Sequence, residues 1–318
     1  MLSLLPIRRF PGVAIFLLLL FGGGGFAGAQ TGAPADAQSA QMDSYEAALK
    51  ANPKDAAARK GEVDTAIQEA LAARRSGNNE LALAFLLRGK YWVPDDPDLL
   101  LDTGVQEESM KLAHDADATL AEAQRLRPGD LKTLYAIARV KMDLSQTEAS
   151  EAAWKAYLSQ RPEDASAHYG YGLLLQMLQR RDEAKAQFQK SVELMPRQAE
   201  SYYRLGEIAR EAGELQQAEQ YYKQALANDA KHAGALTGLA MIAYRQKQYD
   251  EAEGYLEEAV KDAPNFQTAR YYHGLTLAKL GRKDESEKEL AISVQLADAA
   301  NARKDEGRRL ATTPYRPQ

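Results

Sequence analysis

The sequence contains no cysteine, and this absence removes several kinds of site at once. Disulfide bonds, thiolate metal sites, cysteine nucleophiles and lipid attachment at cysteine all need that side chain. Only four histidines are present, and no two share the i, i+3 or i+4 spacing that places metal ligands on one helix face. We therefore expect no metal ion and no cofactor.

Motifs typical of catalysis are also missing. No serine lies in a strand-turn-helix elbow, and no glycine-rich loop joins a strand to a helix. Carboxylate pairs such as Glu257 and Glu258 lie on charged faces, with no apolar pocket beside them to raise a pKa. His168 and His273 occupy positions that are expected to pack. The sequence therefore predicts a protein that is not an enzyme.

Basic clusters are scarce, which argues against nucleic acid as a partner. The formal net charge is -5, and lysines and arginines alternate with acids, as in Arg180-Arg181-Asp182-Glu183. Binding to a duplex draws its affinity from clustered basic residues. We interpret these mixed stretches as solvated helix faces.

Long hydrophobic runs are absent after the first thirty residues. Residues 1–29 read as a secretory signal peptide, with a basic start at Arg8-Arg9, an apolar run over residues 13–21 and a small-residue cleavage site before Gln30. This signal predicts an exported protein that is periplasmic or extracellular. The alternative is an uncleaved membrane anchor over residues 10–29, since that stretch approaches the span of a bilayer.

Large apolar side chains are also missing from residues 30–41. Residues 30–42 are therefore expected to form a flexible linker. Residues 43–62 read as an irregular N-terminal helical cap. The charged stretch 301–311 reads as a C-terminal capping helix, and 312–318 as a tail.

Between these ends, residue types recur every 34 positions. A small residue recurs at Ala70, Gly104, Ala138, Gly172, Gly206, Ala240 and Gly274. A second small residue follows twelve positions later, at Ala82, Ala116, Ser150, Ala184, Ala218, Ala252 and Ser286. A large residue comes four positions after that, at Leu86, Leu120, Trp154, Phe188, Tyr222, Leu256 and Leu290.

These columns have physical reasons. Two antiparallel helices pack closely only where small side chains meet at the crossing, and the large column fills the space between neighbours. Proline closes most units, as at Pro128 and Pro196, because it cannot continue a helix. In the last unit Asp298 takes its place. Glycines such as Gly77, Gly213 and Gly281 suit the turn inside a unit.

The pattern resembles the tetratricopeptide repeat family, whose 34-residue helix-turn-helix unit has this arrangement. The resemblance implies an all-α fold, a right-handed α-solenoid of stacked antiparallel helix pairs. It predicts seven repeats over residues 63–300. Their ranges are 63–96, 97–130, 131–164, 165–198, 199–232, 233–266 and 267–300.

The resemblance also implies that the first helix of each repeat lines an inner groove. The family's groove positions fall here on Tyr135, Tyr169, Tyr203, Tyr271, Arg139, Arg210, Met177, Met241, Tyr244 and Arg245. Tyrosine, methionine and arginine are favoured at protein contacts, so we expect an extended or helical peptide as ligand. The alternative is that the tyrosines pack against the next repeat with their hydroxyls at the surface.

The sequence thus predicts a non-catalytic interaction scaffold of the bacterial cell envelope that binds other proteins or peptides. One alternative is a cell-wall protein that binds carbohydrate or assists an enzyme, with the tyrosines stacking on sugars. Another is a purely structural spacer with an empty groove.

Overall fold

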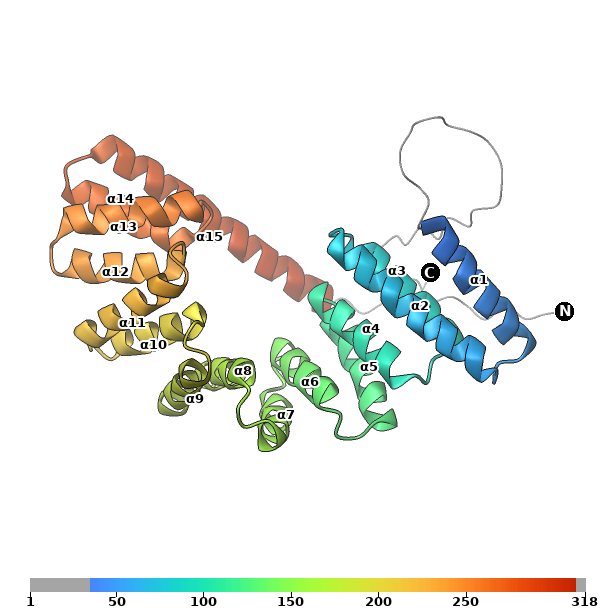
Figure 1. The fold of residues 1–318 in the computed structure, drawn as a ribbon. Coiled ribbons are helices and arrows are strands. Elements are labelled where there is room, and N and C mark those ends of the chain that lie inside the picture. The colour runs from blue at the N-terminus through green and yellow to red at the C-terminus, as the bar shows by residue number, and fades with distance from the viewer. Residues whose placement is uncertain (1–34, 313–318) are drawn as a thin grey trace, which may run out of the picture.

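The structure, a computed structural model, describes residues 35–312 and the side chains of residues 40–303. This part of the chain is entirely α-helical, with a leading helix, α1 (Ala35–Ala51), and seven antiparallel helix pairs stacked in chain order (Figure 1). This array of stacked helix pairs confirms the all-α fold expected from the sequence. The segment expected to be a signal peptide, residues 1–29, lies outside the described residues.

The helix pairs repeat with a step of 34 residues, except that the first helix of the first pair starts ahead of this register. The first helices of the pairs are α2 (Ala56–Arg75), α4 (Pro97–Ser109), α6 (Leu131–Asp143), α8 (Ala165–Met177), α10 (Ala199–Glu211), α12 (Ala233–Arg245) and α14 (Gln267–Lys279). The second helices are α3 (Asn79–Trp92), α5 (Ala113–Leu126), α7 (Thr147–Gln160), α9 (Arg181–Leu194), α11 (Leu215–Asn228), α13 (Tyr249–Asp262) and α15 (Lys283–Thr312).

Local side chains set the ends of these helices. Asp96, Asp130 and Asp164 cap the first helices of three pairs, because each carboxylate accepts a hydrogen bond from a backbone N–H in the first turn. The turn inside every pair has one residue in the left-handed region. These residues are Gly77, Lys111, Ser145, Gln179, Gly213, Lys247 and Gly281.

The large residue of each second helix fills the core between neighbouring pairs. Trp154, Phe188 and Tyr222 are fully buried. A Cβ added to Gly172 would lie 2.7 Å from the Phe188 ring, and one added to Gly206 would lie 2.5 Å from the Tyr222 ring. The rings therefore rest directly on the backbone of the first helix, which requires the small residue at that position.

The first helices lie on the inner side of the array. Consecutive first helices contact each other in most steps, as α2 does with α4 and α12 with α14, whereas second helices make no comparable contacts within residues 35–312. In a curved stack the closer elements are those on the inside of the curve. The pairs accordingly trace an open arc, with α2 and α3 near one end and α14 near the other (Figure 1).

Both ends differ from the expectation drawn from the sequence. α1 begins at Ala35, inside the segment 30–42 that was expected to be flexible, because alanines and glutamines there have high helix propensity. α15 runs without a break from Lys283 to Thr312, so the stretch 301–311 is not a separate helix. A proline at position 298 would have ended this helix, whereas Asp298 allows it to continue.

The described helices do not include a membrane span. None of them is at once long and apolar enough to cross a bilayer. The anchor considered for residues 10–29 lies outside this part of the chain.

Candidate peptide-binding groove

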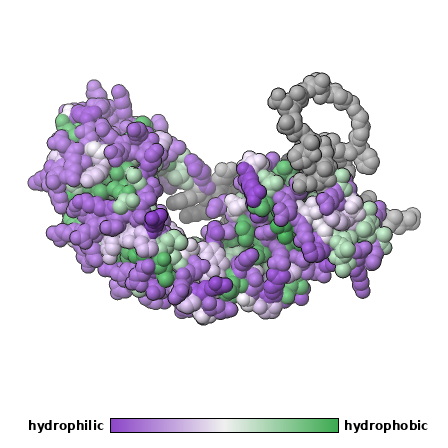
Figure 2. All heavy atoms as spheres, viewed as in Figure 1, coloured by the Kyte–Doolittle hydropathy of each residue, from purple (hydrophilic) through white to green (hydrophobic). Residues whose placement is uncertain are grey.

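The inner surface of the arc is the candidate binding surface. It is formed by the first helices, and in the space-filling view the molecule is hollowed between its two ends (Figure 2). The side chains predicted from the sequence to line it fall into three groups, which differ in burial. One group takes part in packing, one is exposed, and the rest are partly exposed.

Tyr135, Tyr169 and Tyr203 belong to the packed group. Each ring is only partly exposed and lies against the large aromatic residue of its own second helix. The ring centroids are 5.0 Å apart for Tyr135 and Trp154, 5.9 Å for Tyr169 and Phe188, and 6.2 Å for Tyr203 and Tyr222. These tyrosines therefore support their own helix pairs, whereas the packing alternative placed them against the next repeat.

Neighbouring groups fix Tyr203 most firmly. Its ring lies 4.8 Å from the His232 ring, and Arg204 stacks on it at 5.2 Å. His232 is itself held in place, since its Nδ1 accepts a hydrogen bond from the backbone N–H of Ala235 and its Nε2 lies 3.0 Å from Glu200. The site of Tyr203 is thus built from two successive pairs.

Burial also affects the hydroxyls of these tyrosines. It raises the pKa of Tyr135 and Tyr169, and it is the main cause that raises the pKa of Tyr203 to about 12. The phenols consequently stay protonated at neutral pH. They can donate hydrogen bonds to a ligand at the groove, but they carry no charge for recognition.

The exposed group has four members. Met177 and Tyr271 have 52% and 43% of their surface exposed, which is unusual for large apolar side chains in this protein. Arg139 and Arg245 are also exposed. Tyr271 belongs to an aromatic cluster at the last pair, because its ring meets the edge of Tyr272 at 5.4 Å.

The remaining predicted residues are partly exposed. Tyr244 contacts Tyr249 and Tyr272 edge-on, and Met241 lies beside it on the same helix with partial exposure. Arg210 is engaged by Glu207 at 2.9 Å, whose carboxylate also accepts a hydrogen bond from the Tyr222 hydroxyl. Arg210 is therefore held by the scaffold.

Two other arginines differ in how they are held. Arg139 pairs at 2.7 Å with Glu108 of the preceding pair, so it links two first helices across the inner surface. Arg245 makes no ion pair among residues 40–303. It is the predicted arginine with the greatest freedom to meet a ligand.

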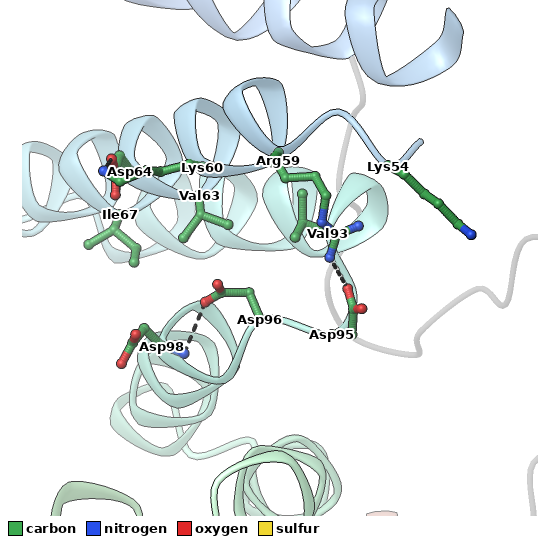
Figure 3. A pocket seen from close by; sticks show the side chains of 11 residues that line it. Lys54, Arg59, Lys60, Val63, Asp64, Ile67, Val93, Asp95, Asp96 and Asp98 are labelled. Carbon is green, nitrogen blue, oxygen red and sulfur yellow. Dashed lines mark hydrogen bonds and ion pairs between the residues drawn. The ribbon is translucent and has the colours of Figure 1, made fainter. Parts of the chain in front are cut away.

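A hollow of about 670 Å³ lies at the N-terminal end of the inner surface, between α2 and the start of α4 (Figure 3). It exists because α2 starts at Ala56, ahead of the repeat register, and its first turns extend past α4. Val63, Ile67 and Val93 provide its apolar part. Such a hollow can take one side chain of an extended ligand.

The rim of this hollow is charged with both signs. Lys54, Arg59 and Lys60 lie on the α2 side, and the carboxylates of Asp95, Asp96 and Asp98 lie on the α4 side (Figure 3). Arg59 bridges to Asp95, and this hydrogen bond is the main cause that lowers the pKa of Asp95. Asp96 also caps α4, so these aspartates read in the sequence as a helix start, and the early start of α2 at Ala56 is the feature that opens the hollow.

Comparison with known protein families supports the repeat pattern described above. Three profiles described as tetratricopeptide repeat match residues 135–180, 163–231 and 209–280. A search of curated protein sequences found no match.

Several solved structures share the fold. PilF of Pseudomonas aeruginosa is 19% identical, with 68% of this chain and 99% of that chain covered and a TM-score of 0.59. A tetratricopeptide repeat protein of Parabacteroides merdae is 16% identical, with coverages of 74% and 93% and a TM-score of 0.59. The Cut9 and Hcn1 hetero-tetramer of the APC/C is 14% identical, with coverages of 81% and 49% and a TM-score of 0.56. At these identities the similarity concerns the fold.

Proposed function

Because this chain is a tetratricopeptide repeat protein, we propose that it is a non-catalytic scaffold that binds a partner polypeptide along the inner surface of its helix array. The observation that carries the proposal is the exposure of Met177, Tyr271 and Arg245 on first helices, where the packing of the array does not need them. Adaptable thioethers, rigid phenol rings and unpaired guanidinium groups are typical contact residues.

The rest of the inner surface suits a preformed site. Tyr135, Tyr169 and Tyr203 are fixed against buried aromatic rings, so this part of the surface loses little freedom when a ligand binds. Their neutral hydroxyls provide hydrogen bonds, and the hollow beside Ile67 provides a place for one ligand side chain. Most of the ordering cost then falls on the partner segment.

The proposed place of action is the bacterial cell envelope. It rests on the signal-like residues 1–29, with their basic start, apolar run and small-residue site before Gln30. Fractionation of cells and N-terminal sequencing of the recovered protein test this part. An N-terminus at Gln30 in the exported fraction supports it, and recovery from the cytosol with Met1 intact contradicts it.

The binding proposal is tested by affinity capture from envelope extract with the tagged chain from Gln30 onward. One variant removes inner contacts by Tyr271→Ala together with Arg245→Ala. The matched control is Tyr91→Ala, which removes a tyrosine that is 78% exposed on the second helix α3.

A polypeptide retained by the parent and by Tyr91→Ala, but lost from the inner-surface variant, supports the scaffold proposal. Equal retention by all three proteins contradicts it. Recovery of glycan alone would replace it with the carbohydrate-binding alternative.

A further inference from the structure

We propose that Glu253, Glu257 and His273 form a binding site for a divalent transition-metal ion of the zinc type, which links the sixth and seventh helix pairs. Glu253 and Glu257 lie one turn apart on α13, and His273 lies on α14. One potential ligand atom from each residue lies within 4.8 Å of the others. The two helices therefore bring one nitrogen and two oxygen donors together.

The state of His273 is the observation that points to a ligand. Its residue surface is only 7% exposed, and neither ring nitrogen has a hydrogen-bond partner among the described residues. Glu289 does not satisfy it, because its Oε2 lies 3.7 Å from Nδ1 and the same carboxylate accepts two hydrogen bonds from Arg270, at 2.8 and 2.9 Å. A buried imidazole without partners is costly unless something else binds it.

The third and fourth helix pairs offer an internal comparison. Three 34-residue steps earlier, the same positions hold Glu151, Lys155 and Tyr171. Glu151 binds the Lys155 ammonium at 2.7 Å and accepts a hydrogen bond from the Tyr171 hydroxyl at 2.9 Å. There a lysine supplies the cation, and every polar group has a partner.

The junction of the fifth and sixth pairs follows the same rule. Glu219 occupies the position of Glu253, and Lys223, one turn later, binds it at 2.6 Å. Among these three junctions only the one at Glu253 has an acid, Glu257, in place of that lysine. The lysine charge of the two compared junctions is thus missing here, and a metal ion would replace it.

The surrounding charges agree with a cation at this point. Arg282 pairs with Glu253 and Glu285, and Arg270 pairs with Glu289. These two arginines, with Lys288 near Glu285, face four carboxylates, counting Glu257, so the cluster keeps an excess of negative charge. A carboxylate has two oxygens, and Glu253 can therefore hold Arg282 and a metal ion at once.

The donor set selects the kind of ion. Imidazole suits zinc, copper and nickel, whereas magnesium and calcium prefer oxygen ligands alone. Tetrahedral zinc at bond lengths of about 2.1 Å holds its ligands roughly 3.4 Å apart, so small rotations of the glutamate side chains close the site. A ligating histidine usually donates its other N–H to a carboxylate, and Glu289, now 3.7 Å from Nδ1, is the carboxylate that would have to move closer for that role.

Titration of the untagged, chelator-treated chain with zinc chloride tests this site, by calorimetry and by native mass spectrometry. We expect one ion per chain, and a rise in the midpoint of thermal unfolding when zinc is present. Glu257→Lys restores the arrangement of Lys155 and should weaken zinc binding at least about tenfold while the chain stays folded, and His273→Gln should weaken it similarly.

Glu258→Gln is the matched control, since Glu258 is the next residue and lies outside the cluster. It should bind zinc like the parent. No zinc binding by the parent, or equal binding by the parent and Glu257→Lys, would overturn the proposal. Equal binding of magnesium chloride would overturn the assignment to the zinc type. If His273→Gln does not fold, the Glu257→Lys variant still tests the proposal, because Glu257 is exposed.

Discussion

The indole ring of Trp154 lies against the backbone of Gly170, so closely that a Cβ on the glycine would be 2.6 Å from Cζ2. Trp154 belongs to α7 and Gly170 to α8, so this contact joins the third and fourth helix pairs. Tyr222 meets Gly238 in the same way two steps later. Packing between these successive helix pairs therefore depends on large rings that contact glycine.

The first prediction concerns this contact. Gly170→Ala should lower the free energy of unfolding by about 1 to 3 kcal/mol, because the added methyl group overpacks a rigid ring. The matched control is Gly254→Ala on α13, where an added Cβ meets nothing within 4 Å. That change should raise stability by about 0.5 to 1 kcal/mol through helix propensity. Urea unfolding of both variants measures the contrast, and equal effects would contradict this account of the packing.

The second prediction concerns the turn inside each pair. Gln179 and Lys247 have φ values of 60° and 67° at the position where three other pairs have glycine. A residue with a Cβ in the left-handed region costs about 1 to 2 kcal/mol, and glycine removes this cost. Part of the gain is lost, because glycine has greater conformational freedom in the unfolded chain. Gln179→Gly should therefore raise stability by about 0.5 to 1 kcal/mol.

The reverse change, Gly213→Ala, should lower stability by about 1 kcal/mol, since Gly213 has a φ of 81°. Urea midpoints of the two variants check the pair. Opposite signs are expected. A loss of stability in Gln179→Gly would show that its side chain contributes more than the backbone strain removes.

Much of the fold could be predicted from residue columns. The small residue at Gly172 and the large residue at Phe188 predict a crossing of two helices, and the structure brings them into contact. The ends were harder to predict. Asp298 removes the signal that stops the second helix, but the sequence does not show how far a helix then continues. The early start of α1 at Ala35 has no strong capping signal either.

The third prediction separates packing from recognition on the inner surface. Tyr203→Ala should lower the free energy of unfolding by roughly 2 to 4 kcal/mol, because the ring is wedged between Tyr222 and His232. Tyr271→Ala should change it by no more than about 0.5 kcal/mol, since Tyr271 is exposed. Thermal or urea unfolding of the two variants tests this difference. Similar losses in both would show that Tyr271 is also structural.

The groove could be predicted less completely than the fold. The 34-residue spacing places Tyr169 and Tyr271 at equivalent positions, yet the first is packed and the second exposed. The neighbouring large residue is Phe188 in one pair and Leu290 in the other, and Tyr271 belongs to the last pair of the described array. Histidine spacing along one helix could not predict the proposed metal cluster, because Glu257 and His273 lie on two helices.

The fourth prediction concerns pH. Glu62 on α2 is fully buried and neither carboxylate oxygen has a hydrogen-bond partner among the described residues. Burial is the main cause that raises its pKa to about 7, Glu46 and Asp43 raise it further, and Arg88 opposes them. The folded state therefore holds a proton that the unfolded chain releases near pH 4.5.

Glu62 should consequently destabilise the fold progressively as pH rises from about 4.5 to about 7, and by a constant amount above that. Glu62→Gln should raise stability by about 2 to 3 kcal/mol at pH 8 and have little effect at pH 4. Unfolding measured across this range tests it, with the exposed Glu80→Gln as control. A gain that is independent of pH would contradict the assignment to ionisation.

The central claim, that the inner surface binds a polypeptide, is tested most directly by photo-crosslinking in cells. A photoreactive amino acid is placed at Met177 or Tyr271 on the inner surface, and at Tyr91 on the outer side. We predict that the same polypeptide is crosslinked from both inner positions and not from Tyr91. Crosslinks from Tyr91 alone, or no polypeptide at any inner position, would contradict the account.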